Sequence, residues 1–365
     1  MKIINYDTPQ YNKKSNTAKT TPFGGYFACP IKELHVQPMH EDKNAIILLK
    51  ELQKKCGEYF RIIVQLGDRV TENIEDIQLD KYGYISNANP TKWGQDNKLF
   101  LPDGKTLAIF KKAKDYQTGE YLATALNMPK ININAPIEGG NCFLGKKNTG
   151  EYFALIGNKN LYGNYIPLIA KKIGIKLENI HLISQPDIHI DLGIRPINYP
   201  YVLLGDRGLT TKLIKSHTHK LDAITQMLIE SSENYHRFSY ANTETIEKEL
   251  IQNGFIPIRV PGLLGQNKIN YMNAIVHQES NGDLIYITND CQPYGYRNID
   301  INNLFKKYLM EKVPKVKKVK FINGGLGYDG ENYRTYTSFC LARTNGGIHC
   351  MSNERPDFEK WNIMA

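Results

Sequence analysis

Short apolar segments alternate with amphipathic segments of helical spacing along most of this 365-residue chain. Ile46, Leu49 and Leu52, for example, recur at helical spacing, and an apolar segment follows them. Strands that alternate with helices form sheets covered by helices, so the sequence predicts an α/β fold. The recurring helix-then-strand unit indicates a repeated structural module. The predicted helices cover 42–60, 160–175, 221–238, 243–255 and 300–313, and the predicted strands cover 61–68, 179–184 and 316–322.

The chain shows no internal boundary between domains. No Gly/Ser-rich or Pro-rich linker interrupts it, so we expect residues 23–365 to form a single domain. Residues 8–22 are polar and flanked by prolines, and residues 1–22 are expected to form an extended arm. The N-terminus lacks the apolar run of a signal peptide, and no stretch approaches the length of a membrane span. We therefore expect a cytoplasmic protein without a membrane partner, and export without a cleaved signal stays open.

The net charge of the chain is +9 at pH 7. The densest basic run, 312–320, alternates lysines with valines, so these lysines are expected on the solvated face of a strand. Without a basic face that is supported by aromatic residues or a helix-turn-helix, nucleic acid is not an expected partner. The positive field would instead attract an anionic or C-terminally charged substrate and repel a dication.

The six cysteines are scattered and form no CxxC pair, which argues against a disulfide framework and against a cysteine-rich zinc site. One of them, Cys350, lies in the segment NGGIHCMSNERP, directly after His349 and the pair Gly346-Gly347. Two glycines let a backbone pass close to a ligand, so this segment has the composition of a specialised turn. A cysteine there is either a small buried apolar residue or a nucleophile.

A second candidate segment, QPDIHIDLGI, carries Asp187, His189 and Asp191 at steps of two. In a strand these side chains would share one face, and three ionisable groups on a buried face need partners. The pattern therefore indicates a strand that lines a cleft or a divalent metal site, with a solvent-facing edge strand as the alternative. His217 and His219 have HxH spacing, but nothing nearby completes a ligand set, so they are expected at the surface.

A third candidate segment, APIEGGNCFLG, places Glu138 after an apolar-polar run and before Gly139 and Gly140. A carboxylate at the end of a strand beside two glycines is expected to face a ligand or another side chain. Cys142 lies past the glycines and is expected in the core.

In this order, the three segments resemble the motifs of the guanidine-modifying superfamily, which includes arginine and agmatine deiminases, peptidyl-arginine deiminases and amidinotransferases. The likeness is greatest to the agmatine deiminase and bacterial peptidyl-arginine deiminase branch. EGGN at 138–141 resembles the EGG motif of that branch, HID at 189–191 its HxD motif, and GGIHCMSNERP its C-terminal HC motif. The resemblance covers roughly residues 60–356 and implies a five-module α/β propeller with a central active-site channel.

The resemblance also implies a role for each motif residue. Cys350 would be the nucleophile, and His189 would protonate the departing ammonia and then activate water. Glu138 would orient and charge-stabilise His189. Asp191 would hold the guanidinium. Because consecutive side chains of a strand point to opposite faces, His349 is expected to be structural.

The family also carries an early aspartate that grips the guanidinium, within a Trp and Arg-Asp pattern. We choose Asp80 for this role, because it follows an apolar alternation and precedes a glycine, with Asp76 as the alternative. Gly346 and Gly347 would let the backbone approach the substrate. Trp93 would line the mouth of the site by cation–π contact.

The reaction implied by the resemblance is deimination through a covalent amidino-thioether, which yields a ureido group plus ammonia without a metal or organic cofactor. Amidino transfer to an amine through the same intermediate is one alternative, and guanidine binding without catalysis is another. The implied partner is a small-molecule or peptidyl guanidino substrate. Agmatine and peptidyl arginine both stay open, as does the oligomeric state.

Overall fold

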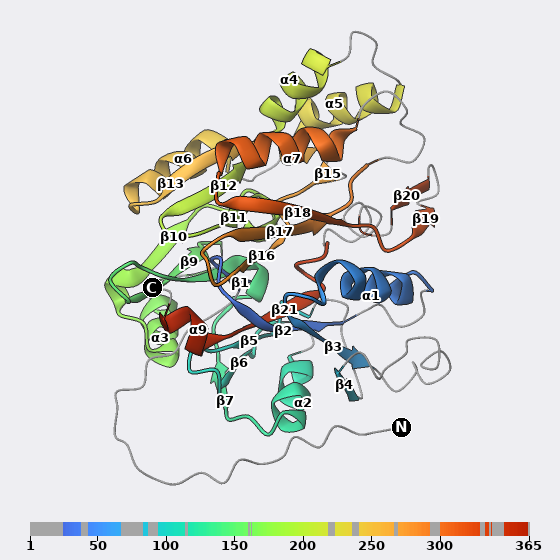
Figure 1. Ribbon diagram of the computed structural model, residues 1–365. Coiled ribbons are helices and arrows are strands. Elements are labelled where there is room, and N and C mark those ends of the chain that lie inside the picture. The colour runs from blue at the N-terminus through green and yellow to red at the C-terminus, as the bar shows by residue number, and fades with distance from the viewer. Residues whose placement is uncertain are drawn as a thin grey trace.

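The computed structural model of the chain has its strands at the centre and most of its helices at the periphery (Figure 1). The predicted N-terminal arm, 1–22, lies outside the residues that the structure describes. The described residues are 25–37, 43–66, 83–86, 94–113, 116–159, 161, 163–217, 223–235, 241–265, 269–292, 300–328, 333–335, 337 and 347–363.

Within these residues the strands form five sheets of three or four strands and two ribbons of two strands, and we number the sheets in chain order. The first sheet has the order β21 (Ser352–Pro356), β2 (Ile31–Val36), β3 (Arg61–Leu66), β4 (Gly83–Ser86), and the second has β5 (Lys98–Phe100), β6 (Leu107–Phe110), β7 (Lys130–Ile133). The third has β1 (Gly25–Tyr26), β8 (Cys142–Lys146), β9 (Tyr152–Gly157), β10 (Ile180–Ile183). The fourth has β11 (Ile194–Pro196), β12 (Tyr201–Gly205), β13 (Ile256–Val260), and the fifth has β16 (Ile275–Gln278), β17 (Leu284–Asn289), β18 (Val316–Ile322). The ribbons are β14 (Leu263–Leu264) with β15 (Ile269–Asn270), and β19 (Leu326–Tyr328) with β20 (Tyr333–Thr335).

The helices connect these strands. They are α1 (Lys43–Cys56), α2 (Gln117–Ala125), α3 (Tyr165–Ile173), α4 (Arg207–His217), α5 (Ala223–Tyr235), α6 (Thr243–Gln252), α7 (Ile301–Lys312) and α9 (Phe358–Ile363), with the 3₁₀ helices η3 (Gly139–Asn141), η4 (Leu177–Asn179) and η5 (Ile190–Leu192). The five predicted helices are present as α1, α3, α5, α6 and α7, and the three predicted strands as β3, β10 and β18. In the part of the chain that the structure describes, no helix is long and apolar enough to cross a membrane.

The five sheets share one topology, which confirms the α/β fold and the repeated module. In each sheet two antiparallel strands are followed by a helical crossover to a third strand that lies parallel to the second. The second sheet shows the simplest form: β5 is antiparallel to β6, α2 follows, and β7 returns parallel to β6.

In the first sheet, the antiparallel partner of β2 comes from the far end of the described chain. β21 pairs with β2 so that Ile31 lies opposite Pro356 and Val36 lies opposite Ser352. β21 begins two residues after Cys350. The pairing of these two distant strands therefore fixes the position of the candidate nucleophile.

The segment that precedes β2 runs along three other sheets. The backbone N–H of Phe27 donates to β8 of the third sheet (2.6 Å), and the N–H of Ala28 donates to Ile197, which follows β11 of the fourth sheet (3.0 Å). The carbonyl of Cys29 accepts from β16 of the fifth sheet (2.9 Å). This segment therefore ties the third, fourth and fifth sheets to the first.

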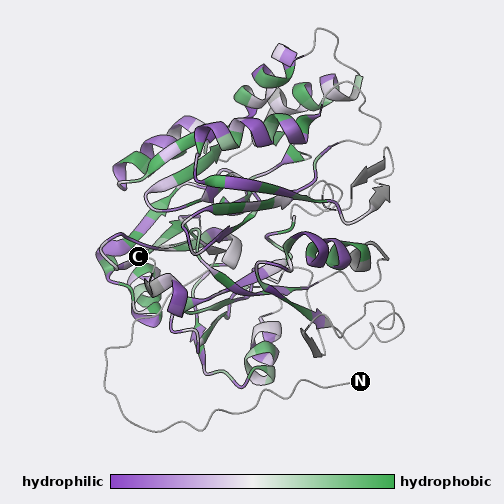
Figure 2. Ribbon diagram, viewed as in Figure 1, coloured by the Kyte–Doolittle hydropathy of each residue, from purple (hydrophilic) through white to green (hydrophobic). Residues whose placement is uncertain are grey.

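Apolar side chains fill the space between the sheets and their helices. The outer helices α1, α6 and α7 carry both hydrophilic and hydrophobic residues (Figure 2), as expected for helices with one face on a core. On α1, Leu48, Leu49 and Leu52 are fully buried. Lys317 and Lys318 of β18 are exposed, as the sequence predicts for the run of lysines and valines.

The strand predicted at 187–191 is wrong. The segment forms bends and then the helix η5. Its backbone donors bond to side chains instead of a neighbouring strand: the N–H of Ile188 donates to the Asp187 carboxylate (2.7 Å), and the N–H of Ile190 donates to the Asn141 amide oxygen (3.1 Å). Side-chain acceptors of this kind compete with the hydrogen bonds of a sheet.

Candidate active site

In each sheet the shared module begins with one strand of the antiparallel pair, namely β21, β5, β8, β11 or β16. The segments that directly precede these five strands come together, and we call them the site segments. They cover 347–351, 94–97, 138–141, 188–192 and 270–273. Each contributes polar or ionisable side chains: Cys350 before β21, Asp96 before β5, Glu138 before β8, His189 and Asp191 before β11, and Asn273 before β16. The shared module thus delivers one segment from each sheet to a common site.

Backbone hydrogen bonds join the site segments of the first three sheets. The N–H of Gln95 donates to the carbonyl of Cys350 (3.3 Å), which joins the second sheet to the first. The N–H of Gly139 donates to the carbonyl of Asp96 (3.0 Å), which joins the third sheet to the second. The relative positions of Cys350 and of the turns that carry Asp96 and Glu138 are therefore set by the main chain.

Asparagine side chains complete the ring. The Asn141 amide oxygen accepts from the N–H of Ile190 (3.1 Å), which joins the third and fourth sheets. The Asn270 amide donates to the carbonyl of Leu192 (2.9 Å), which joins the fourth and fifth sheets. Asn273 then joins the fifth sheet to the first, so the five segments form a closed ring of hydrogen bonds.

Asn273 holds the turn that carries Cys350. Its Oδ1 accepts from the N–H groups of Gly347 (3.1 Å), His349 (3.1 Å) and Cys350 (3.4 Å). Its Nδ2 donates to Asp191 Oδ2 (2.9 Å) and to Cys350 Sγ (3.0 Å). One side chain therefore positions both the thiol and the carboxylate beside it.

Asp191 lies fully buried against Cys350. Its Oδ2 accepts from the thiol (3.3 Å) and from His349 Nδ1 (2.8 Å). Its Oδ1 is also buried, and it accepts no hydrogen bond from the described residues. An unpaired buried carboxylate oxygen is costly, so this atom indicates the position of a ligand donor.

His349 contacts Asp191 from a position that Arg195 determines. Arg195 is fully buried, and its Nη1 donates to His349 Nε2 (2.7 Å) while its Nη2 donates to Glu354 (3.1 Å). Because a guanidinium cannot accept a hydrogen bond, Nε2 must carry the lone pair, and the ring proton lies on Nδ1 toward Asp191. This contact fits the structural role that the sequence predicts for His349.

His189 lies between two carboxylates of the site. Its Nε2 is 2.7 Å from Glu138 Oε2, and its Nδ1 is 3.8 Å from Asp96 Oδ1. Burial alone would lower the pKa of His189, but Asp96, Glu138 and Asp191 outweigh it and raise the pKa to about 9. The hydrogen bond from His189 lowers the pKa of Glu138. The pair therefore has the geometry expected of a protonated imidazole oriented by a carboxylate.

Asp96 is a further carboxylate of the site, from the second sheet. Burial raises the pKa of Asp96 to about 7, with His189 opposing the shift. Its Oδ1 is buried and accepts no hydrogen bond from the described part of the chain. Fully buried Lys98 donates to the carbonyl of Gly94 (2.8 Å) and so holds this turn, and burial lowers the pKa of Lys98 to about 7.

The thiol of Cys350 is protonated in the absence of a bound cation. Burial raises the pKa of Cys350 well above its ordinary value, and Asp191 and Asp96 raise it further. A cation placed between these carboxylates and the thiol would reverse the effect and favour the thiolate. Cys142, in contrast, is a fully buried core residue of β8, as predicted.

Two glycines of the motifs allow close contacts. A Cβ at Gly140 would lie 2.4 Å from His189 Nδ1, so glycine is needed for the imidazole to pack there. A Cβ at Gly347 would lie 2.4 Å from Asn289 Oδ1, which accepts from the N–H of Ile348 (2.9 Å). The structure thus gives Gly347 a close contact with the supporting side chain of Asn289, and its predicted approach to the substrate stays a prediction.

The structure brings together Cys350, His189, Glu138 and Asp191, which the sequence predicts as site residues. Asp80, Asp76, Trp93 and Gly346 lie outside the described residues, and their predicted roles stay predictions.

Asp96 and Asn273 were not predicted from the sequence. A signal for Asp96 exists, because Trp93-Gly94-Gln95-Asp96 keeps the tryptophan and the aspartate of the family pattern, with glutamine in the place of arginine. Asn273 belongs to no motif. Asn273 lies two residues before the first strand of its module, as Cys350 and Asp96 do in theirs. Only the topology reveals this shared position.

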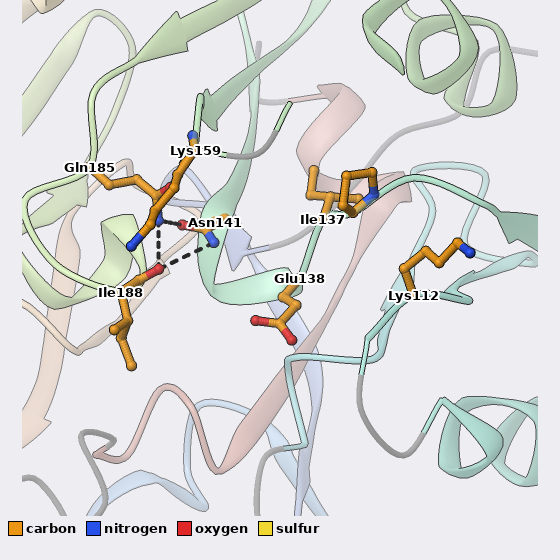
Figure 3. A pocket seen from close by; sticks show the side chains of 8 residues that line it. Lys112, Ile137, Glu138, Asn141, Lys159, Gln185 and Ile188 are labelled. Atoms are coloured by element: carbon orange, nitrogen blue, oxygen red, sulfur yellow. Dashed lines mark hydrogen bonds between the residues drawn. The ribbon is translucent and has the colours of Figure 1, made fainter. Parts of the chain in front are cut away.

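A pocket of about 270 Å³ opens beside Glu138. Figure 3 shows Glu138 near its centre, with Lys112 on one side and Lys159 on the other. The lining consists of Lys112, Pro136, Ile137, Glu138, Asn141, Lys159, Gln185 and Ile188.

The described residues contain no group of three or more His, Cys, Asp or Glu side chains placed to hold a metal ion. Asp187, a candidate ligand in the sequence, accepts from the N–H of Ile188 (2.7 Å). His217 lies exposed in the last turn of α4, where its Nδ1 contacts the carbonyl of Leu213 (2.9 Å). His219 lies outside the described residues.

Comparison with known proteins gives a match in structure only. No family model matches the sequence, and no curated protein matches it. The structure is similar to that of C. jejuni agmatine deiminase, with a TM-score of 0.59, 16% identity, and coverage of 94% of this chain and 99% of that one. It is also similar to agmatine deiminase of Enterococcus faecalis, with a TM-score of 0.57, 12% identity, and coverage of 94% and 99%. The chain therefore has the fold of the agmatine deiminases.

Proposed function

We propose that this protein is a cysteine-dependent deiminase that hydrolyses a guanidino group to a ureido group plus ammonia. The observation that carries the proposal is a pair of buried carboxylate oxygens, Asp96 Oδ1 and Asp191 Oδ1, that accept no hydrogen bond within the described residues. They lie in a site that also holds a thiol and a protonated imidazole. A planar cation with several N–H groups is the ligand that such a pair would accept. The names of the structural relatives support the same substrate chemistry.

The first half of the reaction breaks a carbon–nitrogen bond. The bound guanidinium lowers the pKa of Cys350, whose proton leaves to solvent, and Sγ then attacks the guanidinium carbon. His189, which is protonated at neutral pH, gives the proton on its Asp96-facing Nδ1 to one amino group. Ammonia departs, and a cationic amidino-thioether remains on Cys350.

The second half restores the enzyme. Neutral His189 takes a proton from a water molecule that attacks the amidino carbon. The carbon–sulfur bond breaks, the thiolate of Cys350 leaves, and the product loses a proton to become the ureido compound. Glu138 accepts from His189 Nε2 throughout and keeps Nδ1 directed at the substrate. One water enters and one ammonia leaves in each cycle.

We further propose that the five sheets form a five-module propeller around a central channel. The shared topology of the sheets and the closed ring of site segments support this arrangement. In such a fold each module delivers one segment to the channel.

A product assay tests the proposed function. Purified protein is incubated with agmatine, with arginine and with an arginine-containing peptide, and ureido product and ammonia are measured with and without an added primary amine. We expect equal amounts of the two products from at least one substrate without the amine. A product that forms only when the amine is present indicates amidino transfer. No product, together with a Cys350 thiol that is inert to a haloacetamidine, indicates binding without catalysis.

A further inference from the structure

The carboxylate of Asp96 must be ionised to bind a guanidinium, and its surroundings oppose this. Burial raises the pKa of Asp96 to about 7, and the Glu138 and Asp191 carboxylates act in the same direction. Two cations, His189 and Lys98, favour the ionised form. His189 gives up its proton in the first half of the proposed reaction, so Lys98 is the side chain that keeps a positive charge beside Asp96.

The surroundings of Lys98 suit an ammonium group. Lys98 is the first residue of β5, two residues after Asp96, and its side chain is fully buried. Its Nζ donates to the carbonyl of Gly94 (2.8 Å), to Asn97 Oδ1 (3.2 Å) and to Gln37 Oε1 (3.4 Å). Three acceptors match the three protons of an ammonium, whereas a neutral amine would turn its lone pair toward one of the oxygens. The geometry therefore favours the charged form against burial, which lowers the pKa of Lys98.

The three acceptors hold the ammonium of Lys98 without neutralising it, because all of them are uncharged. The Gln37 amide is oriented by Gln65, since Gln37 Nε2 donates to Gln65 Oε1 and leaves Gln37 Oε1 for Lys98. A buried charge of this kind is screened less by salt and water than an exposed one. Asp96 in turn favours the charged form of Lys98. The pair is therefore coupled across the turn that carries Asp96.

We propose that Lys98 is a positioning residue whose buried ammonium keeps Asp96 ionised and so able to bind the guanidinium. The inference rests on the proposed function, in which Asp96 receives the cation. A lysine by itself repels a guanidinium, so removal of its charge would ordinarily strengthen binding. Because Lys98 acts through Asp96, its removal should instead weaken binding.

The pH dependence of guanidinium binding measures this effect. Loss of a nearby opposite charge should raise the pKa of Asp96 by about one pH unit. The ionised fraction of Asp96 should then fall about fivefold at pH 7 and less than about twofold at pH 8.5. Lys98 also acts on His35 of β2, whose pKa burial lowers. The titratable groups that interact with Asp96 are His189, Glu138, Asp191, Lys98 and the Cys350 thiol.

The experiment uses the Cys350→Ser variant, which lacks the nucleophile and its titration. Calorimetry gives the dissociation constants of agmatine, arginine and an arginine-containing peptide between pH 5 and pH 8.5, and the compound that binds most tightly is measured again with Lys98→Met added. We expect binding about fivefold weaker at pH 7 and within about twofold at pH 8.5. Lys147→Met is the matched control, because Lys147 follows β8 at the end remote from the site and donates to Asn179 Oδ1 (2.6 Å). It should leave the pH dependence unchanged.

Two further variants keep the test decisive. Asn97→Leu applies where Lys98→Met does not fold, because it removes one acceptor of the ammonium together with a buried Nδ2 that donates to none of the described residues. It should shift the pH dependence in the same direction and weaken binding about twofold at pH 7. In the Asp96→Asn background, Lys98→Met should not change the pH dependence, because the group through which Lys98 acts is absent.

The outcomes separate this inference from the proposed function. Binding that weakens by the same factor at every pH indicates a structural role for Lys98 and overturns the inference, as does tighter binding. A shifted pH dependence without ureido product from the wild type would support the role of Lys98 and overturn the deiminase reaction alone. Turnover with an unshifted pH dependence would overturn the role of Lys98 alone, and neither binding nor turnover would overturn both.

Discussion

The two sides of the candidate site are built differently. On the nucleophile side, Asp191 and His349 are fully buried, and the Cys350 side chain contacts both Asp191 (3.3 Å) and Asn273 (3.0 Å). On the pocket side, the Glu138 side chain is 39% exposed, and Ile188, Lys112 and Lys159 are exposed as well.

Under the proposed function, this difference would separate the residues that perform the reaction from those that select the substrate. Side chains that are buried and multiply hydrogen-bonded hold one geometry, which a reaction at a single carbon atom requires. Exposed side chains at the mouth exchange water and salt easily, so they discriminate among substrates by modest amounts. Changes on the nucleophile side should therefore have much larger effects than changes at the pocket.

The largest effect is expected for Cys350→Ala. Loss of the nucleophile should lower kcat at least about 10⁴-fold, while the free energy of unfolding changes little, because the substitution removes one sulfur atom. Ureido product formation and thermal unfolding are the measurements. Cys142→Ala is the matched control, since it removes a buried thiol in β8 outside the site. Equal loss of activity in the two variants would contradict the role of Cys350.

The next effect tests which early aspartate binds the guanidinium. Asp96→Asn should lower kcat/KM about 10³-fold, because it removes one of two buried charges that face the cation. If Asp96 is that aspartate, Asp80→Asn should change kcat/KM less than about threefold. A larger loss in Asp80→Asn than in Asp96→Asn would restore the choice made from the sequence.

A smaller effect is expected for Asn273→Asp, which changes one atom of the side chain. The donor Nδ2 becomes an oxygen that faces Asp191 Oδ2 and Cys350 Sγ, so two acceptors replace a hydrogen bond. We expect kcat to fall about 100-fold and alkylation of Cys350 by a haloacetamidine to slow in parallel. Asn303→Asp on the exposed face of α7 is the control. Unchanged alkylation in Asn273→Asp would show that Asn273 does not position the thiol.

The smallest effect concerns stability and pH. The pKa of His189 is raised from 6.5 to about 9, so its pairing with carboxylates stabilises the fold fully below pH 6.5 and is lost as the pH rises through about 9. The destabilisation by His189→Gln should therefore be about 1–2 kcal/mol larger at pH 6 than at pH 9.5 in denaturant titrations. Burial lowers the pKa of His277 to about 4, so near pH 6 the unfolded chain binds a proton there that the folded protein does not. His277→Gln should therefore be slightly less destabilising at pH 6 than at pH 9.5, which is the opposite direction. The same pH dependence in both variants would contradict a charged His189.

The sequence predicts the fold well where periodicity is long. The five predicted helices have apolar residues at regular helical spacing and are all present. The segment 187–191 has the period of a strand, yet its backbone N–H groups donate to the side chains of Asp187 and Asn141. No local sequence pattern reveals the hydrogen bond to Asn141. A partner 49 residues away in sequence, as Asn141 is from Ile190, cannot be read from a short window.

The candidate site is predictable only as far as its motifs extend. Cys350, His189 and Glu138 stand beside glycines or other ionisable residues and could be recognised. Asp96 follows a glutamine where the family pattern has arginine, which hides it. Asn273 functions through its contacts with the Cys350 turn, and those contacts exist only after the fifth sheet and the first have met.

The pairing of β21 with β2 also determines when the site is assembled. Arg355 on β21 donates to Glu33 on β2 (2.8 Å), and 322 residues separate them. At about 5–20 residues per second, the ribosome needs roughly 15–60 s to make that interval. Throughout it, β2 lacks its antiparallel neighbour and the thiol does not yet exist. Under the proposed function, reactivity thus arises only once Cys350 and β21 have been made, so a chain that stops before them carries most of the described strands but no nucleophile.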